Sequence, residues 1–241
     1  MAGAPSRSTL TSPPDLKALV FDVFGTVVDW RVGIAQAASR HGLPGERFAD
    51  AWRARYAPSM DLVRQGRLPW MNLDALHRRS LDELLEEFGA GRLSEAERAD
   101  LVLAWHRLPA WPDAPEGLER LRRRFLLATL SNGGVALLTN LARQADLRFD
   151  RILSAELFHH YKPDREVYLG AADRLALQAS EVGMVAAHRQ DLRAAQRCGL
   201  RAVFVERPRE FGPEGTPDRL PDPESDVSAR DFLELADRLG C

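Results

Sequence analysis

LKALVFDVFGTVVDW, residues 16–30, is the stretch that decides the fold of this chain. Its first half is a run of apolar β-branched and aromatic residues, which predicts a buried strand of a parallel sheet. The run ends on Asp22, so this carboxylate is expected at the carboxyl end of the strand, where ligands of open α/β sheets bind. Gly25 permits a sharp turn, and Thr26 places a hydroxyl beside the carboxylate. For a lone acid in this position, a solvated or capping Asp is the ordinary alternative.

The composition is that of an ordinary globular protein. The chain has 241 residues, of which 45% are hydrophobic and 28% charged, enough for one large domain or for a core with an insert. The net charge of -2 gives no basic field for nucleic acid, and residues 122–124, three arginines, are interpreted as a solvated helix end. We therefore expect no nucleic-acid partner.

Cysteine content and hydropathy bear on the location of the protein. The two cysteines, Cys198 and Cys241, are too few for a disulfide framework and fit a reducing cytosol. No segment approaches the roughly 18 apolar residues of a membrane helix, and the N-terminus lacks the apolar region of a secretion signal. The sequence thus predicts a cytoplasmic protein without membrane contact.

The pattern after the first strand is helical for a long distance. Residues 1–14, rich in Ser, Thr, Pro and Gly, are predicted to be a disordered tail outside the fold. Helical patterns then cover residues 32–41, 45–65, 72–88 and 94–108, the last opened by a capping box at Ser94 and Glu97. Four helices in a row between strand-forming regions indicate an inserted helical cap domain, residues 29–108.

Strands and helices alternate from residue 109 onward. Strands are predicted at 125–130, 151–154, 182–187 and 202–205, and helices at 116–123, 135–144, 165–175, 191–198 and 229–239. Such βαβ units build a parallel sheet with helices on both faces. The expected fold class is α/β, with a doubly wound, Rossmann-like core made of residues 15–28 and 109–241. Residues 208–223, rich in Gly and Pro, are predicted to be a long surface loop.

Further polar residues follow the predicted strands. Ser131 and Asn132 precede two glycines at a helix start, an arrangement that suits an anion, although plain helix capping is equally ordinary. Lys162 precedes a proline, which holds it extended before a helix, and alone it would be a surface residue. Asp191 is the one carboxylate of the loop after the fourth strand. Because Mg²⁺ prefers several oxygen ligands, this loop is poorly suited to bind it. His159 and its neighbour point apart and lack a third ligand, so we expect no zinc site.

Together these segments resemble the four ordered motifs of the haloacid dehalogenase superfamily, from residues 22–29 to the loop that ends on Asp191. The resemblance implies that Asp22 is a covalent nucleophile, that Lys162 neutralises it, and that Asp191 orients the lysine and the hydrolytic water. Thr26 would orient Asp22. The phosphatase branch places a second Asp, which protonates the leaving group, where this chain has Phe24. Because a halide leaves as a stable anion without a general acid, Phe24 favours dehalogenation.

The chain is most similar to the L-2-haloacid dehalogenase (type II) branch. That resemblance implies substrate contacts for Ser131, Asn132 and Tyr168, besides Phe24. The branch also has a Trp-Arg pair whose Arg enters the cleft, and Trp52 and Arg53 match this pair. The planar donor fork of the Arg suits a carboxylate or a departing halide. Arg55 competes with Arg53 for this role, because a helix turns by about 100° per residue.

One loop departs from the pattern of this branch. Residues 186–188 read Ala-Ala-His where better studied dehalogenases have Ser-Ser-Asn. The hydroxyl that positions water is therefore missing, and His188 is expected to replace it.

The expected activity is hydrolysis of short (S)-2-haloalkanoates to (R)-2-hydroxyalkanoates through an aspartyl ester. Substrate and water are the expected partners, no cofactor or metal is expected, and the resemblance suggests a homodimer. Two alternatives stay open: a Mg²⁺-dependent phosphatase or phosphonatase of the same superfamily, and a non-catalytic member, suggested by Ala186, Ala187 and Arg189.

Overall fold

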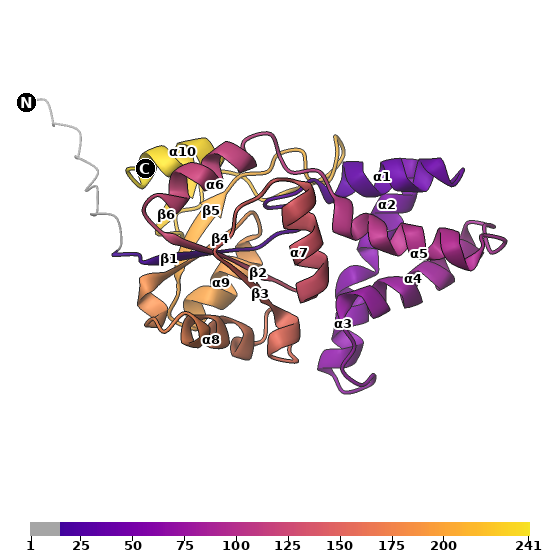
Figure 1. Cartoon of the computed structure of the whole chain (residues 1–241), viewed down its shortest axis with the longest axis horizontal. Helices are drawn as coiled ribbons and strands as arrows, with labels where there is room; N and C mark the ends of the chain where they lie inside the picture. The colour runs from indigo at the N-terminus through magenta and orange to yellow at the C-terminus, as the bar shows by residue number, and fades with distance from the viewer. Residues whose placement is uncertain (1–14) are drawn as a thin grey trace, which may run out of the picture.

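The computed structural model describes residues 15–241, so the predicted tail lies outside the described residues. Its centre is a parallel sheet of six strands in the order β3-β2-β1-β4-β5-β6 (Figure 1). The strands are β1 (Ala18–Phe21), β2 (Leu126–Ser131), β3 (Arg151–Ser154), β4 (Val182–Ala186), β5 (Arg201–Val205) and β6 (Val227–Ala229). The predicted α/β class is confirmed. The short edge strand β6 was not predicted.

Helices cover both faces of this sheet. They are α6 (Ala114–Arg122), α7 (Val135–Gln144), α8 (Arg165–Arg174), α9 (Arg189–Arg197) and α10 (Phe232–Arg238), with short turns η2 (Ala155–Leu157) and η3 (Ala179–Glu181). In Figure 1, α6 and α10 lie together on one side of the sheet, and α8 and α9 lie on the other. The α6–α10 contact is close, because a Cβ added at Gly117 would come within 2.4 Å of the Phe232 Cβ. Since residues 227–229 form β6, the last helix begins at Phe232 and not at 229.

The register of the central strands brings the polar motifs to one edge of the sheet. Phe21, the last residue of β1, pairs with Thr129 of β2 and with Val185 of β4. The residues that follow each strand therefore emerge together at the carboxyl edge. This edge faces the helices of residues 30–104 (Figure 1).

Five helices lie between β1 and α6 in the chain. They are α1 (Trp30–Arg40), α2 (Gly45–Ala54), α3 (Tyr56–Arg64), α4 (Leu73–Glu87) and α5 (Glu95–Ala104), followed by the turn η1 (Trp105–Arg107). The capping box at Ser94 is confirmed. The prediction of one helix over residues 45–65 is wrong, because α2 ends before Arg55 and α3 begins at Tyr56. Pro58 explains the break, since proline has no N–H to donate to the preceding turn.

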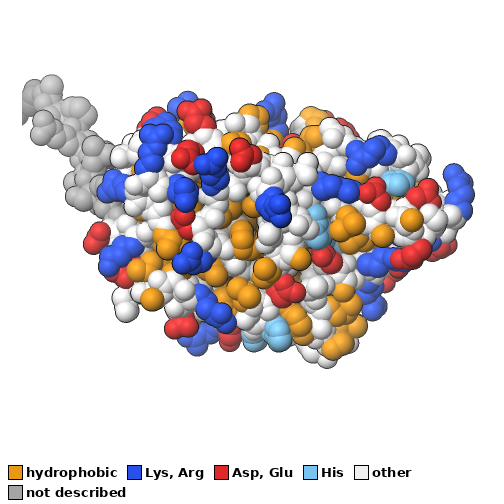
Figure 2. Space-filling model, viewed as in Figure 1, with side chains coloured by type: hydrophobic (Ala, Val, Ile, Leu, Met, Phe, Trp, Pro, Cys, Tyr) orange, Lys and Arg blue, Asp and Glu red, His pale blue; other side chains and the backbone are white. Residues whose placement is uncertain are grey.

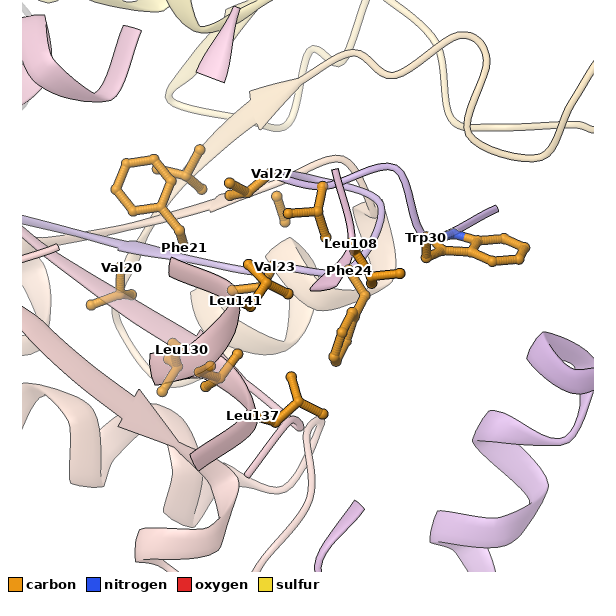
Figure 3. Packing of buried hydrophobic residues seen from close by; sticks show 14 of the residues in the cluster. Val20, Phe21, Val23, Phe24, Val27, Trp30, Leu108, Leu130, Leu137 and Leu141 are labelled. Atoms are coloured by element: carbon orange, nitrogen blue, oxygen red, sulfur yellow. The ribbon is translucent and has the colours of Figure 1, made fainter. Parts of the chain in front are cut away.

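The apolar core runs without interruption from the sheet to these helices. Phe21 packs edge-on against Phe232 of α10, with ring centroids 5.7 Å apart. Figure 3 shows how the buried residues continue from β1 through Val23, Phe24 and Trp30 toward the connecting helices. The loop after β1 is thereby held by apolar packing on both sides, which fixes the position of Asp22.

The surface carries charges of both signs. Figure 2 shows basic and acidic side chains interleaved over the visible face, in keeping with the small net charge. Within residues 15–241, no helix combines the length and the apolar character that a membrane crossing requires.

Candidate active site

Asp22 is buried at the carboxyl end of β1, with 7% of its surface exposed. Its backbone N–H donates to the Val185 carbonyl at 3.0 Å, which extends the pairing with β4 by one residue. Its Oδ1 accepts a hydrogen bond from the Lys162 Nζ at 3.0 Å, and its Oδ2 lies 3.0 Å from the His188 Nδ1. Burial alone raises the pKa of a carboxyl, but the cationic Lys162 and His188 outweigh it and hold the pKa of Asp22 well below its usual range. Asp22 is therefore ionised.

Thr26 fixes the other side of this carboxylate. The Thr26 hydroxyl accepts the Ala187 backbone N–H at 2.9 Å, so its own proton is directed to the Asp22 Oδ2 at 2.8 Å. The predicted orienting contact between Thr26 and Asp22 is thus present. The backbone of the Ala186-Ala187 loop takes part in this contact although its side chains carry no polar group.

Lys162 joins two carboxylates. Its Nζ lies 3.0 Å from Asp22 and 2.5 Å from the Asp191 Oδ2. Burial lowers the pKa of this ammonium, but Asp191 and Asp22 raise it above the ordinary value, so Lys162 is charged. The Tyr168 hydroxyl donates to the other oxygen of Asp191 at 2.5 Å. The Asn132 Oδ1 accepts the Lys162 backbone N–H at 2.7 Å, which leaves the amide nitrogen of Asn132 to face the cavity described below.

His188 bridges Asp22 to a residue that sequence reasoning missed. Its Nε2 lies 3.0 Å from both carboxylate oxygens of Glu210, which also accepts the Trp30 indole N–H at 3.1 Å. Glu210 was predicted to lie in a surface loop, yet only 1% of its surface is exposed. That prediction is wrong for Glu210 because the loop folds back onto Gly25. No local pattern marks a lone Glu in a Gly- and Pro-rich segment as buried.

Arg53 reaches the site from α2. Its guanidinium lies over the ring of Tyr56 at 4.3 Å and over that of Trp30 at 5.5 Å. Its Nε is buried and has no hydrogen-bond partner among the described residues. Arg55, by contrast, donates to the Ala51 carbonyl and to Glu87 on the outer surface of the helices. Of the two arginines, Arg53 is the one that lines the same cavity as Asp22.

These groups surround a cavity of about 510 Å³ between the carboxyl edge of the sheet and helices α2 and α3. Phe24 forms part of the wall, with its ring edge-on to Trp105 at 5.7 Å and to Tyr56 at 6.3 Å. The predicted site residues that line the cavity are Asp22, Phe24, Arg53, Asn132, Lys162, Tyr168, His188 and Asp191.

Two predicted substrate contacts lie outside this lining. The Ser131 Oγ is fully buried and accepts the Gly133 backbone N–H at 3.2 Å, so it caps the following turn. The Trp52 indole N–H donates to the Ser80 Oγ at 3.1 Å among the connecting helices. Trp52 precedes Arg53 on the same helix and points away from the cavity, because successive helical residues differ in direction by about 100°. The structure thus does not bring Ser131 or Trp52 to the cavity.

The acidic side chains of the site already have hydrogen-bond partners, which bears on whether the site could hold a metal ion. Within residues 15–241, no group of three or more His, Cys, Asp and Glu side chains is arranged to hold a metal ion. The carboxylates of Asp22, Asp191 and Glu210 each bond to Lys162 or His188. His159 stacks on Trp70 and His160 contacts Asp164, so these two histidines have different surroundings.

The family follows from the sequence match together with this geometry. Residues 16–199 match the family model described as haloacid dehalogenase-like hydrolase. The chain belongs to this family. The predicted superfamily resemblance is thereby confirmed, and the ordered motifs of the family are the segments that meet around Asp22.

Similar proteins narrow the comparison to one branch of the family. The chain is 33% identical over 207 residues to (S)-2-haloacid dehalogenase 1 of Pseudomonas sp. (strain CBS-3), covering 81% of this chain and 88% of that protein. It is 32% identical to (S)-2-haloacid dehalogenase 4A of Burkholderia cepacia, covering 80% and 84%. A solved L-2-haloacid dehalogenase is 44% identical with a TM-score of 0.90, covering 93% of this chain and 99% of that one. A defluorinating L-2-haloacid dehalogenase is 42% identical, also with a TM-score of 0.90, covering 94% and 96%.

Proposed function

We propose that this protein hydrolyses short (S)-2-haloalkanoates to (R)-2-hydroxyalkanoates through an ester formed on Asp22. The observation that carries the proposal is the state of this carboxylate. It is ionised, largely withdrawn from water, and held at the wall of a cavity by Lys162, Thr26 and His188. A fixed and desolvated carboxylate is suited to nucleophilic attack on carbon. The similar proteins named (S)-2-haloacid dehalogenase support the same activity.

In the first step, an oxygen of Asp22 attacks C2 of the substrate from behind the carbon–halogen bond. The halide leaves with the bonding electron pair, the configuration at C2 inverts, and an ester forms. In the second step, water attacks the Asp22 Cγ, and the 2-hydroxy acid leaves with the Asp22 oxygen that formed the ester. Asp191, held by Lys162 and Tyr168, is the carboxylate available to accept the water proton.

Substrate orientation falls to Asn132 and Arg53. The Asn132 amide nitrogen donates to the substrate carboxylate, because its oxygen is already used by Lys162. The Arg53 guanidinium, whose buried Nε has no hydrogen-bond partner among the described residues, stabilises the departing halide. Phe24 excludes water from the reacting carbon and supplies no proton, which fits a leaving group that needs none.

The domain organisation is part of the same proposal. We assign residues 29–108 as a cap over a core of residues 15–28 and 109–241, because Arg53, Tyr56 and Met60 of α2 and α3 line the same cavity as Asp22. A homodimer is proposed from the resemblance alone, and light scattering of the purified protein tests it. A cytoplasmic location is proposed from the free thiols of Cys198 and Cys241.

The test is a direct comparison of leaving groups. Purified protein is incubated with (S)-2-chloropropanoate, with its (R) enantiomer, and with p-nitrophenyl phosphate plus Mg²⁺. We expect chloride and (R)-lactate from the (S) substrate and negligible nitrophenol. Release of nitrophenol without chloride would instead assign the protein to the phosphatase branch, and no product in any arm would favour a non-catalytic member.

A further inference from the structure

His188 lies between two carboxylates, which determines where its protons are. Its Nδ1 faces the Asp22 Oδ2 at 3.0 Å, and its Nε2 faces both Glu210 oxygens at 3.0 Å. Ionised carboxylate oxygens only accept hydrogen bonds, so each ring nitrogen must carry a hydrogen. His188 is therefore an imidazolium that donates in both directions and cannot act as a base toward water.

The hydrogen bonds to Asp22 are divided unequally between its two oxygens. Oδ2 accepts hydrogen bonds from the Thr26 hydroxyl and from His188, and these two bonds occupy both lone pairs of Oδ2. Among the described residues, Oδ1 accepts only from Lys162, so one lone pair of Oδ1 is free. Asp22 itself lines the cavity.

We propose that Oδ1 of Asp22 is the attacking atom, that Thr26 and His188 form an oxyanion site for Oδ2, and that Glu210 is the positioning residue that holds His188. This inference rests on the proposed dehalogenase function and adds to it a specific role for each oxygen. Glu210 acts through His188 and touches neither substrate nor reacting atoms.

The electron count of the two steps fits this division. When Oδ1 bonds to C2, Oδ2 becomes the carbonyl oxygen of a neutral ester. When water attacks Cγ, the C=Oδ2 π pair moves onto Oδ2 and creates an alkoxide, while a water proton passes to Asp191. The pair returns as the Cγ–Oδ1 bond breaks, and the product alkoxide takes the proton that Asp191 accepted. The second water proton leaves the regenerated Asp22 carboxyl for solvent. Negative charge thus develops on Oδ2, where Thr26 and His188 already point their hydrogens.

Glu210 becomes important when the ester forms. In the free enzyme, burial lowers the pKa of His188, but Glu210 and Asp22 outweigh it and raise this pKa to about 10. Esterification removes the charge of Asp22, and Glu210 is then the one carboxylate among the described residues still in contact with the imidazolium. The other charged groups that line the cavity are Arg53, Asp61, Arg64, Lys162, Asp191 and Arg197. Since the cation Lys162 contacts Asp22 and Arg53 lines the same cavity, His188 would lose its proton more easily without Glu210.

Glu210 packs closely against the loop that follows Asp22. A Cβ added at Gly25 would come within 2.1 Å of the Glu210 Oε1, and the φ of +86° at Gly25 also favours glycine. The Trp30 indole N–H donates to the same carboxylate oxygen. Gly25 and Trp30 both belong to the segment that carries Asp22, so Glu210 is built against the nucleophile's own loop.

Rapid-quench single turnovers with (S)-2-chloropropanoate test the inference, with chloride release reporting ester formation and intact-protein mass reporting ester loss. For His188→Asn we expect chloride release to change less than ester hydrolysis, because Lys162 and Thr26 still hold Asp22. Ester hydrolysis should slow by about 100-fold, because loss of an oxyanion donor typically costs about 10² to 10³ in rate. The ester-bearing protein should therefore accumulate in this variant and not in the wild type.

Glu210→Gln separates a positioning role from a merely structural one. Its ester hydrolysis should fall as pH rises between about 6 and 9, where the wild type stays level, since His188 loses its proton earlier without the carboxylate. The matched control is Glu214→Gln, which removes the same charge from an exposed position of the same loop and should behave like the wild type.

The outcomes are distinguishable. Slower chloride release in His188→Asn without accumulated ester, or a pH-independent loss in Glu210→Gln, would overturn the inference and leave the proposed function standing. Absence of chloride from the wild type itself would refute the proposed function. If either single variant is unfolded, the double variant His188→Asn/Glu210→Gln, which leaves no unpaired buried charge, should accumulate ester as well. Normal ester hydrolysis in the folded double variant would also overturn the inference.

Discussion

Replacing Arg53 by lysine keeps the positive charge at the cavity and removes the planar fork of donors. In the structure this guanidinium lies 4.3 Å from the Tyr56 ring and leaves its buried Nε without a partner among the described residues. The donor is therefore oriented before any halide arrives. A lysine ammonium at the end of a flexible chain would offer a single point of contact in place of two fixed N–H groups.

The magnitude follows from the contact that is lost. One hydrogen bond to a charged group contributes about 1.5–3 kcal/mol, and the stacking of Arg53 on Tyr56 contributes about 0.5–1 kcal/mol more. The sum, about 2–4 kcal/mol, is acquired mainly as the halide develops its charge in the transition state. At about 1.36 kcal/mol per tenfold change, we expect kcat/KM to fall by about 30- to 900-fold.

The assay is chloride release from (S)-2-chloropropanoate by Arg53→Lys and by Arg55→Lys. Arg55 is the matched control because it lies two residues after Arg53 in the chain and pairs with Glu87 away from the cavity. We expect Arg55→Lys to stay within about threefold of the wild type, since an exposed ion pair contributes little. Near-normal activity of a folded Arg53→Lys, with a large loss in Arg55→Lys, would refute our reading of which arginine serves the cavity.

Three further results are expected. Dialysis against a chelator should leave chloride release unchanged, and activity that disappears and returns with Mg²⁺ would contradict the role given to Phe24. Tyr168→Phe removes the 2.5 Å hydrogen bond to Asp191 and should slow ester hydrolysis by about 10- to 100-fold in single turnovers, whereas an unchanged rate would exclude Asp191 orientation by Tyr168. His77 is buried with a pKa lowered to about 3, chiefly by burial, so it must gain a proton on unfolding below about pH 6.5. Urea denaturation at pH 7 and pH 5 should therefore show an acid loss of about 2 kcal/mol that is absent in His77→Phe, and equal losses in both proteins would contradict this assignment.

The sheet and most of the site could be predicted because their signals are local. The predicted strands are short apolar runs followed by polar residues, and the carboxyl ends of such strands meet at one edge. Asp22, Lys162 and Asp191 were found in this way together with the family motifs, and the structure joins all three by hydrogen bonds.

The remaining features depend on tertiary packing that no local pattern reports. Glu210 lies in a segment whose composition indicates a surface loop, and its burial is decided by contact with Gly25 and Trp30. The direction of a side chain on a helix is equally hard to assign, because Trp52 and Arg53 are adjacent in sequence but only Arg53 lines the cavity. The break at Arg55 follows from Pro58, which a helical period over residues 45–65 conceals.

Covalent catalysis by Asp22 is tested most directly by following solvent oxygen through one turnover. Excess enzyme is mixed with (S)-2-chloropropanoate in ¹⁸O-water, and the lactate and the peptide that contains Asp22 are analysed by mass spectrometry. The ester route transfers an Asp22 oxygen to the product and takes a solvent oxygen into the protein, so we expect the label on the Asp22 peptide and almost none in the lactate. Label in the lactate alone would show that water attacks C2 directly, and it would contradict the role of Asp22 as nucleophile.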